Sequence, residues 1–378
     1  MRDMVRIMNN RERLQAIMNY EKPDRMPAVH FGFTPEVIER WVQEGHLSKD
    51  ILDLEDYSFE GEEILSQKLG FDFGWHASRV TTTELFPFFE EKFVEHLDNG
   101  FDKYINCDGV YILQRTGAKS IPAEAGHLLQ DRDSWEKYYL PRLTYTEERF
   151  SQSELDRVIS EQAKGNPAGL HCGSLCGRIR DYLGIVEFSY MMADDEELLE
   201  EIFDTIGNLC LKSVKRTLDS GIKFDYAHFW EDICYKNGPL LSPDIFRDFT
   251  AHYYKKITGL LSEYGIHTIS VDCDGLVDSL LPIWLENGVN TMFPIEVGTW
   301  NASIAPWREK YGRPLRGIGG MRKSALACDY AAVDEEIERL KPMAQLYGYI
   351  PCPDHRIPDD AIWENVQYYC EKVKKILD

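Results

Sequence analysis

Acidic, cysteine and histidine residues follow several short apolar runs in the last third of the chain. The runs IHTISV, VNTMFPI and YGYIP lead into three polar groups: Asp272, Cys273 and Asp274; Glu296; and Cys352, Asp354 and His355. Each run has the length of a buried strand and precedes a segment of helical spacing. The loops after parallel strands of such folds emerge on one face. We therefore expect these side chains to meet in one pocket.

Two adjacent acids, Glu231 and Asp232, end another apolar run, DYAHFWED, which also contains His228. Carboxyl groups at a strand terminus can bind a metal or act as general acid and base. The alternative is a solvated loop. Together with the later clusters, the pattern predicts four catalytic candidates: Glu231, Asp232, Asp272 and Asp354.

Basic and imidazole side chains near the same strand ends are candidates for substrate binding. Arg322 and Lys323 follow a pair of glycines and could hold an anionic group at a helix start, although a solvated basic pair fits equally. The other expected substrate contacts are His30, His228, Asp274 and Glu296.

The element pattern that must position these residues alternates strands with helices. A helix is expected within residues 1–25 and a first strand at 26–33; further strands are expected at 167–174, 222–232, 266–272, 289–295, 315–319 and 347–351. An eighth strand is expected within residues 70–120, beside a small antiparallel insertion at about 76–120. The sequence thus predicts a single domain, residues 1–378, built as a (β/α)₈ barrel with these additions.

Composition narrows the class of protein. The formal net charge is −22 and argues against nucleic acid as a partner, since phosphate binding requires clustered Lys and Arg. We expect no membrane span and no signal peptide. The nine cysteines are scattered, and reduced thiols in a cytoplasmic enzyme are the expectation.

Several motifs, taken in order, resemble the uroporphyrinogen decarboxylase superfamily. They are KPDRMP, WED with SPDIFRDF, VDCDG with LLPIWLENGVN, FPIEVG, GIGGMRKSALA and YIPCPDHRIPDDAIWENVQYY. The resemblance covers nearly the whole chain and implies a (β/α)₈ barrel. True porphyrinogen decarboxylases carry an arginine-rich segment after the first strand, whereas this chain reads VHFGFTPEV there. The resemblance therefore favours the corrinoid-linked methyltransferases of the superfamily.

Those methyltransferases carry a zinc-binding His-x-Cys motif after the strand that ends here at VDC, and a later cysteine ligand. By this resemblance Val271 stands in place of the histidine, Cys273 keeps the middle ligand and His355 takes the last position. Glu231, or else Asp272 or Asp274, is the expected further ligand, giving an oxygen-richer zinc site that could activate an ether or alcohol oxygen.

The leading hypothesis is a corrinoid-dependent O-demethylase component. It would take a methyl group from a small, possibly aromatic methyl ether and pass it to cobalamin on a partner corrinoid protein. A homodimer is a further expectation. One alternative is a decarboxylase or lyase, with Asp272 or Asp354 moving the proton and Arg322 or Lys323 holding a carboxylate. The other is a barrel that binds a corrinoid or tetrapyrrole without turnover.

Overall fold

Seven parallel strands form the central sheet of the computed structural model, which describes residues 7–378 except 55–57, 99 and 116–121. Their spatial order is β15-β14-β13-β12-β9-β8-β3. In chain order they are β3 (Ala77–Ser78), β8 (Gly169–Gly173), β9 (Tyr226–Trp230), β12 (Ile269–Asp272), β13 (Thr291–Ile295), β14 (Arg316–Met321) and β15 (Tyr349–Pro353). Strands β8, β13 and β15 are buried along their whole length, as expected for a parallel sheet covered on both faces.

A separate parallel pair adjoins this sheet. Strand β1 (Val29–His30) pairs with β2 (Phe73–Gly74), and only Trp75 and His76 separate β2 from β3. The strand expected within residues 70–120 is therefore split in two, each half pairing with a different neighbour. Beyond β1, Phe33 forms an isolated parallel bridge with Ile357, which follows β15. All the strands predicted from the sequence are present.

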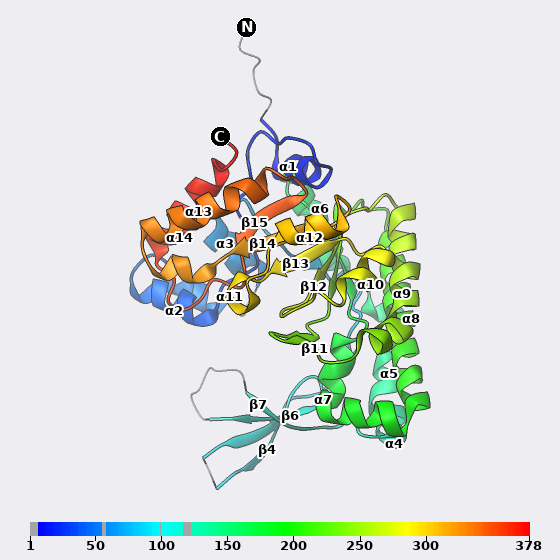
Figure 1. The fold of residues 1–378 in the computed structure, drawn as a ribbon. Helices are drawn as coiled ribbons and strands as arrows, with labels where there is room; N and C mark the ends of the chain where they lie inside the picture. Colours follow the sequence, from blue (N-terminus) through cyan, green and yellow to red (C-terminus); the bar gives the residue numbers. More distant parts are fainter. Residues whose placement is uncertain (1–6, 55–57, 99, 116–121) are drawn as a thin grey trace.

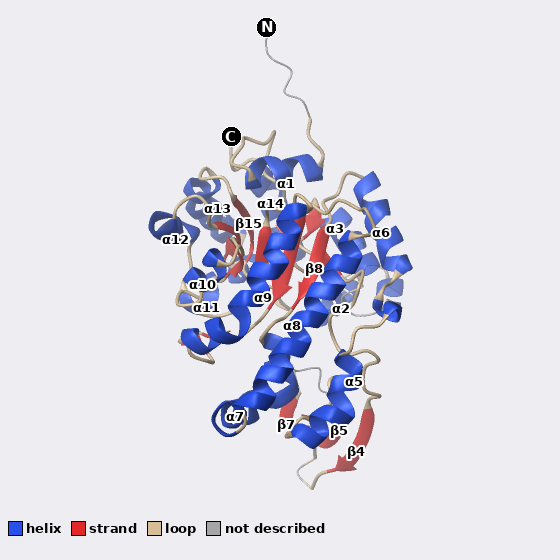
Figure 2. Cartoon of the chain, turned by 90° about the vertical axis from the view of Figure 1, so that its right-hand side faces the viewer, coloured by secondary structure: helices blue, strands red, loops and turns tan. Residues whose placement is uncertain are grey.

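Helices surround the strands, as Figure 2 shows. The longer ones are α1 (Asn10–Met18), α2 (Pro35–Gln43), α3 (Phe59–Leu69), α6 (Gln152–Ala163), α7 (Gly177–Asp194), α8 (Glu196–Leu218), α9 (Pro243–Glu263), α12 (Ile304–Tyr311), α13 (Tyr330–Ala344) and α14 (Trp363–Lys374). Shorter helices are α4 (Arg132–Ser134), α5 (Leu140–Leu143), α10 (Leu281–Glu286) and α11 (Val297–Trp300).

Capping side chains fix where these helices begin. Ser242 accepts a hydrogen bond from the backbone of Ile245 at the start of α9. Asp195 caps α8 directly after Asp194, which ends α7. Helix α7, at 177–194, was not expected from the sequence.

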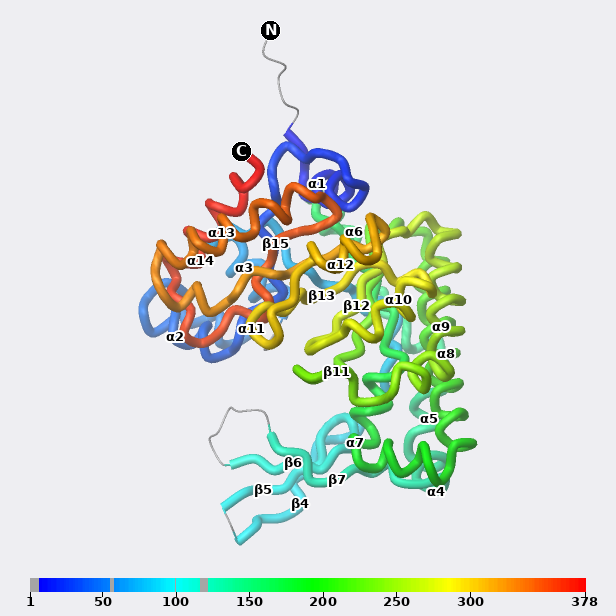
Figure 3. The backbone as a smooth tube through the Cα atoms, viewed as in Figure 1, coloured from blue at the N-terminus to red at the C-terminus, as the bar shows by residue number. Residues whose placement is uncertain are grey.

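A four-stranded antiparallel sheet lies apart from the central strands, as Figures 1 and 3 show. It consists of β4 (Lys92–His96), β5 (Asp102–Ile105), β6 (Val110–Gln114) and β7 (Ala123–His127), paired in chain order. The predicted insertion at about 76–120 overlaps this sheet, and part of that prediction, residues 99 and 116–120, lies outside the described residues. The same holds for residues 1–6 of the predicted N-terminal helix. No described helix is both long and apolar enough to cross a bilayer.

Candidate functional site

A cavity of about 340 Å³ lies where the central strands end. Its lining comes from segments far apart in the sequence: Phe31, Phe59, Glu62, Trp75, His76, Ala77, Arg79, Arg157, His171, His228, Trp230, Asp272, Phe293 and Arg356. The volume lies near the lower end of the range for small-molecule sites. This is the carboxyl end of the parallel strands, where the sequence predicted the reactive groups to gather.

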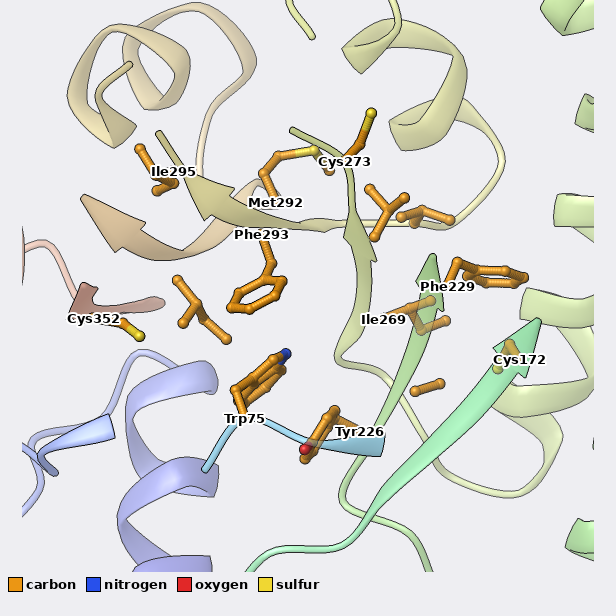
Figure 4. Close-up of a cluster of buried hydrophobic side chains, with 14 of the residues drawn as sticks. Trp75, Cys172, Tyr226, Phe229, Ile269, Cys273, Met292, Phe293, Ile295 and Cys352 are labelled. Atoms are coloured by element: carbon orange, nitrogen blue, oxygen red, sulfur yellow. The ribbon is translucent and has the colours of Figure 1, made fainter. Parts of the chain in front are cut away.

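Aromatic rings form one wall of the cavity. Phe31 and Phe293 meet edge to face with centroids 4.7 Å apart, and Trp75 stacks on Tyr226 at 3.9 Å. Figure 4 shows Trp75 and Phe293 facing the same space between the strands. Such a wall offers ring-stacking and edge contacts to a flat, apolar ligand.

Two neutral histidines from neighbouring strands face this cavity. His171 accepts a hydrogen bond from Gly173 N at Nδ1, so its proton lies on Nε2, which forms no hydrogen bond with any described residue. His228 contacts Ser270 Oγ through Nδ1 at 2.8 Å, and that hydroxyl donates to Ala227 O, so Nδ1 is the donor. Burial lowers the pKa of His228 to about 3 and that of His171 well below its ordinary value. Both rings are therefore neutral near pH 7, each with Nε2 left for a ligand.

Asp272 is the one predicted catalytic acid that lines the cavity. Its Oδ2 lies 3.9 Å from Nε2 of His228, and its side chain is 23% exposed. Burial raises the pKa of Asp272 well above its ordinary value, and the nearby carboxylates of Asp274 and Asp232 raise it further. Asp272 therefore carries its proton at a pH where ordinary aspartates have lost theirs.

Asp232 belongs to the same acidic neighbourhood but does not line the cavity. Burial, together with the charge of Asp274, raises its pKa to about 6, against the opposing charge of Arg180 3.7 Å away. Its backbone adopts φ 46°, a left-handed conformation uncommon for aspartate. Asp274 is 3.6 Å from Nε2 of His355.

Three arginines, Arg79, Arg157 and Arg356, contribute to the same lining. Arg157 is paired with Glu154 at 2.7 Å, and Arg79 is half exposed, 3.6 Å from Glu84. In a chain of net charge −22, this concentration of guanidinium groups gives the cavity a local charge unlike that of the molecule as a whole.

Glu231 does not line the cavity, and it does not form a metal site with Cys273 and His355. It is fully buried, and its carboxylate accepts hydrogen bonds from the backbone N–H groups of Leu175, Cys176 and Gly177 at 2.8–2.9 Å. The hydroxyls of Ser174 and Tyr254 also donate to it. Both oxygens are thus occupied in holding the first turn of α7, which corrects the sequence-based expectation of a catalytic or metal-binding role.

The structure likewise does not bring Cys273 and His355 together with Glu231 around a metal. Cys273 is 3% exposed, its Sγ accepts from Ile233 N at 3.4 Å, and burial raises the pKa of its thiol well above the ordinary value. Glu231, Cys273 and His355 do not form a group whose ligand atoms lie within 4.8 Å of one another. Figure 4 shows Cys273 on the opposite side of the strands from Phe293. The expected zinc set does not fit this arrangement.

Two further acids predicted for the site support the backbone instead. Asp354 accepts from the backbone N–H groups of Val297, Gly298 and Lys323 at 2.7–3.0 Å. Glu296 accepts from Gly275 N at 2.6 Å and from the hydroxyl of Thr299. Both carboxylate oxygens of Asp354 thus accept backbone hydrogen bonds, and Asp354 does not line the cavity.

The predicted basic pair also lies elsewhere. The guanidinium of Arg322 is 3.4 Å from Glu336 on α13, and neither Arg322 nor Lys323 lines the cavity. Of the predicted site residues, Asp272 and His228 are the two that line it. The three arginines that line it, Arg79, Arg157 and Arg356, were not predicted.

One group of possible metal ligands lies at the wall of the cavity. Ligand atoms of His30, Glu62 and His76 are all within 4.8 Å of one another. His30 was expected to contact substrate, but it faces α3 and lines a neighbouring cavity of about 150 Å³. Glu62 and His76 line both cavities. The sequence offered little signal for this group, because its members come from three separate elements.

Comparison with solved structures gives the fold a precedent. A methyltransferase from Methanosarcina mazei superposes with a TM-score of 0.61 and 14% identity, covering 98% of this chain and 100% of that one. A B12-independent methionine synthase from a Shewanella species, in complex with selenomethionine, aligns with a TM-score of 0.49 and 10% identity over 93% of this chain and 98% of its own. Neither a protein-family model nor a curated protein sequence matches the chain. The chain therefore shares its fold with the methanogen enzyme.

Proposed function

We propose that this protein is an enzyme that removes a methyl group from a small aromatic methyl ether and passes it to a corrinoid protein. The observation that carries the proposal is the placement of Asp272, whose carboxyl group lies 3.9 Å from Nε2 of His228 in an aromatic-lined cavity and whose pKa is raised by burial. Demethylation of an ether needs such an acid, because the departing oxygen must be protonated to leave as a phenol.

The proposed reaction assigns a task to each part of the cavity. The aromatic wall of Phe31, Trp75 and Phe293 holds the ring. The bond between the methyl carbon and the ether oxygen breaks, its electron pair stays on oxygen, and Asp272 delivers a proton there. The neutral Nε2–H of His171 can donate a hydrogen bond to the ligand. A corrinoid on a partner protein supplies the nucleophile that accepts the methyl group.

The wider architecture supports the proposal by analogy. We infer that the strands close into a (β/α)₈ barrel, since the β1–β2 pair adjoins one end of the sheet and the Phe33–Ile357 bridge adjoins the other. Membership of the uroporphyrinogen decarboxylase superfamily, on the methyltransferase side, is part of the same proposal. A methyltransferase with this fold is the precedent.

Decarboxylation of a small acid is the second candidate, favoured by the arginines in the cavity. Arg79 and Arg356 could hold a carboxylate while Asp272 protonates the carbon left after carbon dioxide departs. A tetrapyrrole would need more room than about 340 Å³ provides.

One experiment separates these functions. The purified chain is incubated with aromatic methyl ethers and chemically reduced cobalamin, and with the corresponding ring acids alone. Methyl transfer predicts a phenol and methylated cobalamin in equal amounts, with Asp248→Asn, an exposed-site control, matching the wild type. Release of carbon dioxide without methyl transfer would support the decarboxylase. Ligand binding with neither product would contradict both.

A further inference from the structure

A histidine, a carboxylate and a second histidine converge at the wall between the two cavities. They are His30 of β1, Glu62 of α3 and His76 from the break between β2 and β3. His30 is fully buried, whereas the side chain of His76 is 34% exposed and reaches the central cavity. We propose that these three residues bind a divalent transition-metal ion, with a coordination position open toward that cavity.

The contact between His76 and Glu62 is the first support for this site. Nε2 of His76 lies 2.5 Å from Oε2 of Glu62. Ligand atoms of these two residues and of His30 all lie within 4.8 Å of one another, close enough to share one bound ion.

The hydrogen bonds around His30 are typical of metal-binding histidines. Ser66 Oγ donates to Glu62 O at 2.7 Å, so it must accept from Nε2–H of His30, also at 2.7 Å. That hydrogen bond fixes the tautomer and leaves the lone pair on Nδ1, which now accepts from Gly32 N at 3.0 Å. A ligating histidine whose other nitrogen donates to an anchored oxygen is the usual arrangement.

Two glycines keep the space around the three ligands open. A Cβ on Gly74 would lie 2.1 Å from Nε2 of His76 and 3.2 Å from Cε1 of His30. A Cβ on Gly32 would lie 2.9 Å from Oε1 of Glu62. Any larger residue at either position would occupy the volume between the ligands.

The donor set indicates which metals fit. Two imidazole nitrogens with one carboxylate, and an open position, suit Zn²⁺ and also Fe²⁺ or Co²⁺, whereas Mg²⁺ and Ca²⁺ prefer oxygen alone. The guanidinium of Arg356 places a positive charge beside the three ligands, because its Nη1 lies 2.8 Å from where a Cβ on Gly32 would be. This charge opposes the binding of a metal cation. We therefore expect Arg356→Gln to tighten metal binding.

Metal content tests the site without any methyl donor or corrinoid. The full-length protein is equilibrated with Zn²⁺, freed of excess metal and analysed by mass spectrometry, and Co²⁺ is used as a visible-absorption probe. We expect about one ion per chain, at least a tenfold loss of affinity in Glu62→Gln and His76→Ala, and a changed Co²⁺ spectrum in either variant.

Two matched variants serve as controls. His228→Ala removes an imidazole from the same cavity, and Cys273→Ser removes the ligand expected from the sequence; both should keep the metal. Wild-type protein that binds no ion, or Glu62→Gln and His76→Ala that bind it as the wild type does, would overturn the site. Circular dichroism of each variant checks its folding. If the wild type transfers methyl groups but binds no ion, the proposed function stands and the metal site is refuted.

Discussion

At the level of single residues, the environment of Asp272 decides the proposed chemistry. The sequence marks Asp232, Asp272 and Asp274 as acids near strand ends, but it does not distinguish them. The structure does, because Asp272 alone of the three lines the cavity, and burial and its acidic neighbours raise its pKa. The same residues illustrate the limit of sequence reasoning, since alternation along β12 cannot show how close Asp232 lies in space.

Ionisation of Asp272 should also lower the free energy of unfolding as the pH rises. Its pKa is raised in the folded protein, so between the ordinary value near 3.8 and the folded value the native state binds more protons than the unfolded state. Stability contributed by this group is present below pH 3.8 and is lost as the pH rises through the folded pKa. We expect Asp272→Asn to have a higher Tm than the wild type at pH 7, with the difference shrinking toward pH 4. Equal Tm values at pH 7 would contradict the raised pKa.

At the scale of elements, Glu231 joins β9 to the start of α7. Gly177 is required at this junction because a Cβ there would lie 1.9 Å from Glu231 O. The sequence predicted β9 and the acid that follows it from local pattern alone. It could not predict the role of Glu231, because the donors belong to residues 54–57 positions earlier, in a helix that the pattern did not indicate.

Glu231→Gln should therefore destabilise the protein rather than act on chemistry alone. The new amide group replaces an acceptor with a donor that faces other donors, and each buried N–H left unpaired costs about 1–3 kcal/mol. We expect a loss of about 3 kcal/mol in the free energy of unfolding, measured by urea denaturation. Glu263→Gln, at an exposed position, is the control and should change it by less than about 0.5 kcal/mol. A Glu231→Gln variant as stable as this control would contradict the role of Glu231 in holding the first turn of α7.

At the scale of the whole molecule, the order of strands and helices was predictable and the contents of the cavity were not. Strand positions follow from local apolar runs, so all the expected strands are present. The cavity instead combines side chains from Phe31 to Arg356, and no short pattern links them. The net charge of −22 gives no sign of this lining, which includes three arginines.

Because three arginines line the cavity, we expect it to bind a ring that carries a carboxylate more tightly than a neutral ring. We expect Arg79→Gln to weaken the binding of benzoate by about tenfold, the equivalent of one charge-assisted hydrogen bond, and to leave the binding of anisole unchanged. Calorimetric titration at low and high salt measures both. Arg247→Gln, on the exposed face of α9, is the matched control. Equal affinities for benzoate and anisole in the wild type would exclude an anion-binding role for the cavity.

The role of Asp272 as proton donor is best tested by the rate of phenol release from an aromatic methyl ether, measured against pH with reduced cobalamin as acceptor. Because the protonated form of Asp272 is the acid, the rate should fall as the pH rises through its raised pKa. Asp272→Asn should lower the rate by about 10²–10⁴-fold and abolish this pH dependence. A wild type that releases no phenol, or an Asp272→Asn variant with the wild-type rate and profile, would contradict the account.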